Sequence, residues 1–285
     1  MTALEPHLYL DLVRQALAED VGSGDQTTDV VVPAGTTATA LLVAKSPCIV
    51  AGLDVARAVF TEVNANVVFT PRCADGQRCA PGDVLAELEG PAAALLTAER
   101  TALNFLQHMT GIATLTGRFV EATGGRLTII DTRKTIPTMR ALAKYAVRCG
   151  GGTNHRMGLY DAILIKDNHI QIAGGIGEAV RRVRARGITL PIEVEAQSLA
   201  DVDAAIEARA DVIMLDNLSD EVMREAVARI AGRARIEISG GVTLERIPAL
   251  SELGADVVSV GAITHSVPAA NISLDMQPHA GSAAR

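Results

Sequence analysis

The sequence predicts an α/β protein with two parts, a mixed α+β N-terminal domain over residues 1–110 and an incomplete (β/α) barrel over residues 111–285. Two observations indicate the barrel. After Gly124 and Gly125, short apolar runs alternate with helical stretches, as expected for a parallel sheet. The polar ends of the later runs recur at residues 195, 216, 239 and 261, in steps of 21–23 residues. This regularity suits a closed or nearly closed barrel better than an open sheet.

The composition excludes several classes of protein. With 285 residues, 48% of them hydrophobic, the chain can form one large or two ordinary domains. Aromatic residues are scarce at 2% and the net charge is −7, so we expect no nucleic-acid partner. The N-terminus has no basic region followed by an apolar run, and no apolar stretch reaches about 18 residues, so we expect neither a signal peptide nor a membrane span.

The four cysteines show neither CxxC pairing nor the spacing of a zinc site. We therefore expect reduced thiols in a cytoplasmic protein.

In the N-terminal part, apolar periodicity predicts helices over residues 7–18 and 53–63 and strands over 39–44 and 67–71. Residues 80–90 form a turn and an alternating strand, similar to the hairpins of biotinyl and lipoyl carrier domains. Such domains carry a modifiable Lys at a hairpin tip, but no Lys lies between Lys45 and Lys134. We expect the carrier-like architecture without the carrier function.

A long helical stretch over residues 92–120 joins the two parts, with an interruption expected at Gly111. Arg100 falls close to the apolar stripe of this helix, which is formed by Leu96, Leu103 and Leu106. The usual interpretation of a lone helical Arg, a solvent-exposed surface residue, is therefore less secure here.

The barrel part contains six expected strands and five expected helices. The strands are 127–130, 162–165, 192–194, 212–215, 236–238 and 257–260, and the helices are 137–148, 176–186, 199–208, 220–230 and 244–253. Residues 271–276 read as one more strand, and whether this end of the chain returns to the N-terminal domain is left open.

Strand side chains alternate in direction, so polar residues between apolar ones must point into the barrel. The alternation turns Glu193, Glu195, Glu237 and Ser239 inward, together with Lys166 and Asp216. Several of these side chains, with Asp131, stand near the C-terminal ends of strands, which is the catalytic face of such barrels. A structural ion pair could explain each one alone, but a set in register points to a site, because buried charges are costly unless paired.

Two further features complete the predicted site. The glycine-containing turns Ser239-Gly240-Gly241 and Val260-Gly261-Ala262 follow the last two strands, where barrels often bind phosphate with backbone N–H groups. Between Asp131 and Tyr160, six cations face one acid, within a chain of net charge −7. This local reversal predicts a ligand rich in carboxylates or phosphates.

These residues together resemble the quinolinate phosphoribosyltransferase family (nicotinate-nucleotide pyrophosphorylase, carboxylating). The resemblance runs from about residue 99 to residue 262, with an N-terminal extension at Gly24–Thr27. Its motifs are Glu99–Asn104, Asp131–Thr135, Asn154–Met157, Ile165–His169, Glu193–Glu195, Met214–Asn217 and Ile238–Gly241.

The resemblance implies conversion of quinolinate and phosphoribosyl pyrophosphate to nicotinate mononucleotide, pyrophosphate and CO₂ in NAD biosynthesis. It implies Mg²⁺, held mainly by phosphoribosyl pyrophosphate with Glu195 and Asp216 as protein contacts, and no organic cofactor. It places Lys166, Glu195 and Asp216 in catalytic roles beside phosphoribosyl pyrophosphate, and the turns 239–241 and 260–262 around its 5′-phosphate. Around quinolinate it places Thr132, Arg133, Lys134, Thr135, His155 and Arg156.

The resemblance further implies a homodimer, in which Arg100 reaches the partner's site, with a higher oligomer left open. Three alternatives compete with this interpretation. Lys166 could serve as the Schiff-base nucleophile of a barrel aldolase, although nearby acids favour a charged ammonium. Residues 80–90 could belong to a binding module. A related phosphoribosyltransferase could act on nicotinate, although the double cationic clamp favours a dicarboxylate.

Overall fold

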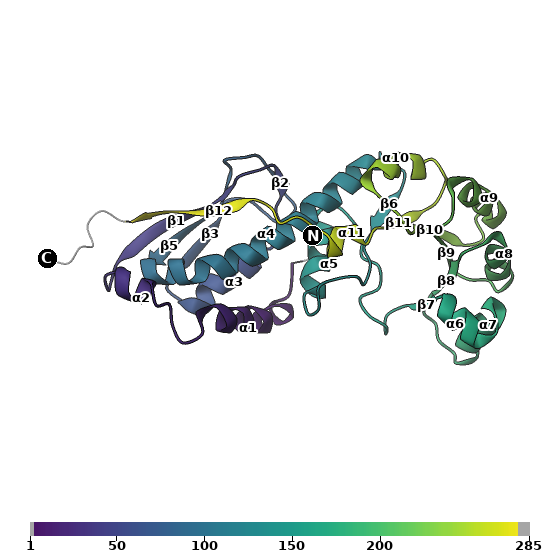
Figure 1. Cartoon of the computed structure of the whole chain (residues 1–285), viewed down its shortest axis with the longest axis horizontal. Coiled ribbons are helices and arrows are strands. Elements are labelled where there is room, and N and C mark those ends of the chain that lie inside the picture. Colours follow the sequence, from purple (N-terminus) through teal and green to yellow (C-terminus); the bar gives the residue numbers. More distant parts are fainter. Residues whose placement is uncertain (1–2, 279–285) are drawn as a thin grey trace. The chain divides into compact units, whose positions relative to one another are not determined.

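A computed structural model of the chain describes residues 3–278 and divides it into two compact units. Within that range, the first unit comprises residues 3–117, 135–151 and 264–278, and the second comprises residues 118–134 and 152–263. The division falls within the longest helix, α4 (Ala92–Ala122), after Gly117. The predicted mixed α+β part and incomplete α/β barrel are confirmed, each with its own sheet (Figure 1).

The first unit is built on a four-stranded antiparallel sheet in the order β12-β1-β5-β3. Alternating side chains form its buried face: Ala40 lies opposite Leu88 and Leu42 opposite Ala86, and all four are buried. The C-terminal strand forms one edge of this sheet, beside β1. The strands are β1 (Thr37–Ala44), β3 (Val68–Pro71), β5 (Val84–Pro91) and β12 (Ile272–Pro278), with a separate antiparallel pair, β2 (Cys48–Ile49) and β4 (Arg78–Cys79).

Helices complete the first unit. Asp75 accepts hydrogen bonds from the backbone N–H groups of Gly52 and Leu53 and from the Tyr145 hydroxyl, so one carboxylate ties the start of α3 to α5. The helical elements of this unit, apart from α4, are η1 (Pro6–Leu8), α1 (Leu10–Val21), α2 (Thr28–Val31), α3 (Leu53–Val63) and α5 (Arg140–Cys149).

The second unit contains the six predicted strands in one parallel sheet, ordered β6-β11-β10-β9-β8-β7. Strands β6 and β7 are its two edges, so the barrel is incomplete. The helices between strands lie along the outer side of the sheet (Figure 1). The strands are β6 (Thr128–Ile130), β7 (Ile163–Ile165), β8 (Ile192–Ala196), β9 (Val212–Asp216), β10 (Arg235–Ser239) and β11 (Val257–Ser259).

The helical elements of the second unit include two that the sequence did not predict. The short helix α6 (Asp167–Ala173) follows β7 directly, and α11 (Ala262–His265) follows β11 and spans the boundary between the units. The others are α7 (Ile176–Ala185), α8 (Leu199–Glu207), α9 (Asp220–Ile230), η2 (Leu244–Arg246) and α10 (Ile247–Leu250).

Two predicted helices have different bounds in the structure. The helix expected from Pro137 begins only at Arg140, because Thr138 has a positive φ of 67° that a right-handed helix cannot include. The helix expected over 244–253 is split into η2 and α10. Pro248 explains the split, since it has no N–H to donate to the carbonyl four residues earlier.

The interruption expected at Gly111 is absent, because α4 is continuous from Ala92 to Ala122. Gly111 instead provides room: a Cβ atom there would clash with the backbone carbonyl of Pro268 and contact Val267. Among residues 3–278, no helix combines the length and apolar character needed to cross a bilayer.

We expect Gly111→Ala to destabilise the protein by about 1–3 kcal/mol, because a backbone carbonyl cannot move aside as a side chain can. The matched control is Gly177→Ala on α7, where an added Cβ meets no heavy atom within 4 Å. There the gain in helix propensity, up to about 1 kcal/mol, should dominate. Urea denaturation of both variants measures the difference, and equal stabilities would contradict the close approach at Gly111.

Candidate active site

The second unit contains a cavity of about 500 Å³ at the C-terminal ends of its strands. Residues of five neighbouring strands line it, from β7 to β11, and the polar ones on β8, β9 and β10 point inward as strand alternation predicted. They include Leu164 from β7, Glu195 from β8, Met214 and Asp216 from β9, and Glu237 and Ser239 from β10. The cavity is of a size that binds small metabolites.

One wall of the cavity is cationic. It comes from the segment after β6 and from the loop before β7, and it contains the predicted residues Thr132, Arg133, Lys134, His155 and Arg156. Burial and the nearby charge of Arg133 lower the pKa of Arg156. The two guanidinium groups therefore repel each other, and an anion between them would relieve that repulsion.

The opposite wall carries the predicted residues of the later strands. Lys166 Nζ lies 3.5 Å from Glu195 Oε2, and Glu195 Oε1 accepts a hydrogen bond of 3.2 Å from the Gln197 amide. Asp216 accepts a 2.8 Å hydrogen bond from the Asn217 amide. The wall is completed by Ser239, Gly240 and Gly241.

Gly240 is required by local packing. Its φ is +88°, and a Cβ atom would clash with the side-chain oxygen of Asn217. Asn217 itself has a positive φ of 56°, so the loops after β9 and β10 fit together only with glycine at position 240.

Five predicted site residues do not line this cavity. Three of them are Val260, Gly261 and Ala262. The backbone N–H of Val260 donates to the Ile130 carbonyl and is therefore already used in the sheet. Ser259, the residue before this turn, does line the cavity. Arg100 and Thr135 belong to the first unit, where Arg100 is exposed on α4.

Of the six cations between residues 131 and 160, three line the cavity. Arg140, Lys144 and Arg148 lie on α5 in the first unit, and Lys144 is buried there. The local charge reversal in the sequence therefore overstates the charge of the cavity wall.

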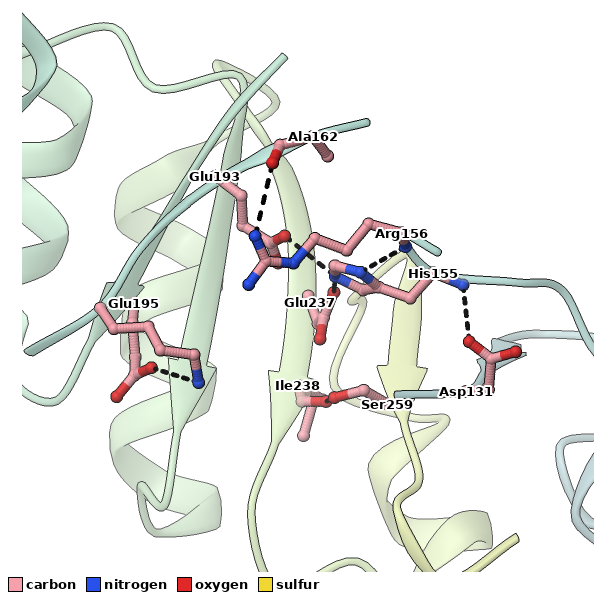
Figure 2. A network of polar contacts seen from close by, with 10 residues as sticks. Asp131, His155, Arg156, Ala162, Glu193, Glu195, Glu237, Ile238 and Ser259 are labelled. Atoms are coloured by element: carbon pink, nitrogen blue, oxygen red, sulfur yellow. Dashed lines mark hydrogen bonds and ion pairs between the residues drawn. The ribbon is translucent and has the colours of Figure 1, made fainter. Parts of the chain in front are cut away.

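Asp131, which is fully buried, holds the cationic wall in place. Its carboxylate accepts a hydrogen bond of 2.7 Å from the Asn154 amide. It accepts another, of 2.9 Å, from the His155 backbone N–H (Figure 2). Thr153 forms a parallel bridge with Ile130 at the edge of the sheet. The loop that carries His155 and Arg156 is thus attached to the strand end from which Arg133 and Lys134 start.

His155, Glu193 and Glu237 form a cluster of contacting side chains (Figure 2), and His155 and Glu237 also line the cavity. His155 Nε2 is 3.0 Å from Glu193 and 3.5 Å from Glu237. Burial lowers the pKa of His155, but the hydrogen bonds and charges of the two acids outweigh it and raise that pKa to about 9. Burial raises the pKa of Glu237 to about 7, in part offset by His155.

The backbone places the His155 proton. The Arg156 N–H points at His155 Nδ1 over 2.7 Å, so a proton on Nδ1 would face another donor. Nε2 therefore carries the ring proton that points toward the acids. The three ligand-type atoms lie within 4.8 Å of one another, a spacing that suits a cation. A metal at Nε2 would require the proton on Nδ1, however, which the Arg156 N–H disfavours.

Four residues that line the cavity were not among the predicted site residues: Asp131, Asn217, Glu237 and Ser259. For Glu237, strand alternation had predicted only that its side chain points inward. The signal for Glu237 was its place in the strand alternation, two residues before Ser239. Asp131 was visible as the acid at a strand end, but its anchoring role depends on a loop more than 20 residues away.

Comparison with known proteins gives a consistent picture. Residues 25–110 match the family model for the quinolinate phosphoribosyl transferase N-terminal domain, and residues 112–275 match that for its C-terminal domain. The chain is 46% identical over 275 residues to the nicotinate-nucleotide pyrophosphorylase [carboxylating] of Mycobacterium leprae, covering 93% of this chain and 96% of that protein.

Further relatives extend the similarity. A probable nicotinate-nucleotide pyrophosphorylase [carboxylating] of Bacillus subtilis is 43% identical, covering 95% of this chain and 94% of that protein. The crystal structure of NadC from Streptococcus pyogenes superposes with a TM-score of 0.94 at 42% identity, covering 98% of this chain and 100% of that one. A nicotinate-nucleotide pyrophosphorylase structure from Francisella tularensis gives 0.93 at 40% identity, covering 96% and 98%.

We expect Asp131→Asn to cost about 1–3 kcal/mol of stability, because the new amide N–H₂ must face either Asn154 or the His155 N–H, which are both donors. Amide hydrogen exchange at His155 should accelerate with it. Asp211→Asn is the matched control: Asp211 is exposed and accepts a backbone N–H from Ile192, which the Asn oxygen can still do, so its cost should stay within about 0.5 kcal/mol. Unchanged exchange at His155 in Asp131→Asn would contradict the anchoring role.

Proposed function

The chain belongs to the quinolinate phosphoribosyltransferase family, and on this premise we propose that it transfers phosphoribosyl from phosphoribosyl pyrophosphate to quinolinate. The products are nicotinate mononucleotide, pyrophosphate and CO₂, in the biosynthesis of NAD. One observation carries the proposal for this chain: a single cavity has a cationic wall of Arg133, Lys134 and Arg156 opposite a wall of Lys166, Glu195 and Asp216. Two chemically different substrates need such opposed walls.

The cationic wall suits quinolinate, a pyridine ring with two adjacent carboxylates. Arg133 and Arg156 can each form paired hydrogen bonds with a carboxylate, and the dianion would relieve their mutual repulsion. His155 is positioned by Asp131 and by the buried acids on the same side, and Thr132 adds a hydroxyl group to this wall.

The opposite wall suits phosphoribosyl pyrophosphate. Glu195 and Asp216 can accept hydrogen bonds from the ribose hydroxyls and favour the positive charge that develops at the anomeric carbon as pyrophosphate leaves. Lys166 can neutralise phosphate charge. The turns 239–241 and 260–262 are the two proposed for the 5′-phosphate. Only 239–241 lines the cavity, with Gly240 allowing close approach of the backbone, whereas the Val260 N–H is already bonded to Ile130.

Bond formation makes the pyridine nitrogen quaternary. When the neighbouring carboxylate leaves as CO₂, the positive charge on this nitrogen stabilises the electron pair left on the ring carbon. The protein contributes by holding the ring nitrogen in line with the anomeric carbon between the two walls. The reaction needs no organic cofactor.

Mg²⁺ is part of the proposal, bound mainly through phosphoribosyl pyrophosphate and water. Glu195 and Asp216 fit as protein contacts, because both present carboxylate oxygens to the cavity and Mg²⁺ prefers such ligands. When bound, the ion would neutralise charge on the leaving pyrophosphate.

We further propose a homodimer in which Arg100 reaches the partner's cavity. Arg100 is exposed on α4, and Leu96, one turn earlier on that helix, is 38% exposed although apolar. Arg is among the residue types enriched at protein interfaces. We place the enzyme in the cytoplasm, which agrees with its four free cysteines.

The direct test is formation of nicotinate mononucleotide from quinolinate and phosphoribosyl pyrophosphate, with and without Mg²⁺. Nicotinate in place of quinolinate tests the related phosphoribosyltransferase. Absence of product from quinolinate at micromolar enzyme would refute the assignment, and activity that survives chelation of Mg²⁺ would refute the metal requirement.

We expect Arg133→Ala and Arg156→Ala each to weaken quinolinate binding about 10–100-fold, the effect of losing a charge-assisted pair worth about 1.5–3 kcal/mol. Binding of phosphoribosyl pyrophosphate should change much less. Arg224→Ala, an exposed Arg on α9, is the control and should leave both affinities unchanged. Titration calorimetry measures each substrate, and equal losses for both would contradict the division into two walls.

The shared site predicts complementation between inactive variants. Arg100→Ala and Lys166→Ala subunits should each be nearly inactive alone. A mixed dimer would contain one intact site, so activity should return on mixing under conditions that allow subunit exchange. No recovery in mixed dimers verified by mass would rule out an Arg100 that acts across the interface.

A further inference from the structure

A second, smaller cavity of about 170 Å³ lies within the same barrel unit. It extends from the exposed N-terminal ends of the strands, at Pro191 and Arg235, to the buried acids Glu193 and Glu237. The space is enough for several water molecules. Glu237 lines both this cavity and the substrate cavity, whereas Glu193 lines only the smaller one.

The surroundings of Glu237 favour its protonated, neutral form. It is 2% exposed, and its Oε1 has no hydrogen-bond partner among residues 3–278. The ring proton of His155 lies closer to Glu193, at 3.0 Å against 3.5 Å for Glu237. Burial, together with the charge of Glu193 and a hydrogen bond with it, raises the pKa of Glu237, and its contacts with His155 only partly offset this rise. A protonated Glu237 removes one of two adjacent buried negative charges.

The proposed reaction requires a proton that the substrates do not supply. When the carboxylate next to the ring nitrogen leaves as CO₂, the electron pair of the broken C–C bond stays on the ring carbon. That carbon must gain H⁺ to give nicotinate mononucleotide. The arginines of the cationic wall are poor donors because they hold their protons too tightly.

We propose that Glu237 is the general acid that protonates this ring carbon, and that water in the smaller cavity returns a proton to it. The proposal rests on the proposed function. In the step, the Glu237 O–H bond breaks and a C–H bond forms with the electron pair left by CO₂. Glu237 becomes a carboxylate, then takes H⁺ from water on its other side, so no oxidant or reductant is needed.

The test compares pyrophosphate release with CO₂ release in wild type, Glu237→Gln and Glu193→Gln. Pyrophosphate reports phosphoribosyl transfer, and ¹⁴CO₂ from carboxyl-labelled quinolinate reports decarboxylation. In Glu237→Gln we expect CO₂ release and nicotinate mononucleotide formation to fall about 100-fold or more relative to pyrophosphate release, the range for loss of a general acid. The dicarboxylated mononucleotide should accumulate and be visible by mass spectrometry.

Glu193→Gln is the control for contact with His155: it removes the shorter of the two contacts, 3.0 Å against 3.5 Å, and Glu193 does not line the substrate cavity. Because Glu193 helps to raise the pKa of Glu237, the comparison is made well below pH 7, where we expect Glu193→Gln to keep one CO₂ for each pyrophosphate. Thermal unfolding and phosphoribosyl pyrophosphate binding verify that both variants are folded.

The pH profile gives a second readout. Glu237 is surrounded by His155 and Glu193, with Arg156 also bordering both cavities. Because the donor must be protonated, wild-type CO₂ release should decline as pH rises through about 7, the pKa to which burial raises Glu237. Glu237→Gln should lack this decline.

Failure of the inference can be told from failure of the proposed function. A wild-type enzyme that makes no nicotinate mononucleotide refutes the function. With an active wild type, three results would overturn the role of Glu237: equal release of both products in Glu237→Gln, equal loss of both, or the same uncoupling in Glu193→Gln. The last would show that the acids act only by positioning His155.

Discussion

The barrel unit depends on how it accommodates buried carboxylates. Asp131, Glu193 and Glu237 are each at most 6% exposed, inside a sheet whose outward residues are almost all apolar. Buried charge is tolerated only with partners, and here most of the partners come from one short loop. The Asn154 amide and the His155 N–H satisfy Asp131, and the His155 ring contacts both glutamates. The requirement for partners thus fixes the loop, and the loop carries Arg156 to the cavity.

The resulting cavity has two walls of different charge. The cationic residues stand at the edge strand β6 and on the loop beside it, and the acids of the opposite wall stand on the central strands β8 and β9. A parallel sheet brings these strand ends together although they are far apart in sequence. In the proposed transfer, the cationic wall binds the aromatic dicarboxylate and the acids of the other wall face the pyrophosphorylated sugar.

The first unit shows a different use of the same principles. Its sheet is closed at one edge by β12, which pairs with β1 along seven residues. The approach of residues 267 and 268 to α4 requires glycine at position 111. Features that looked local in the sequence, such as a helix-breaking glycine, turn out to serve contacts with the far end of the chain.

Local patterns were sufficient for much of the barrel. Apolar periodicity located all six strands, and alternation alone turned Lys166, Glu195, Asp216 and Glu237 toward the cavity, because side-chain direction in a strand is a property of the backbone. Helix bounds were less predictable: the start of α5 depends on a positive φ at Thr138, which nothing nearby signals.

The sequence by itself therefore determined the fold class, the strand ends and the residue types of the site, since all of these follow from short-range periodicity and motif. Only the tertiary structure decided which of six clustered cations face the cavity, where the last strand pairs, and that Glu237 separates two cavities. These facts depend on contacts between residues distant in the chain, and short-range patterns carry no information about which distant partners will meet.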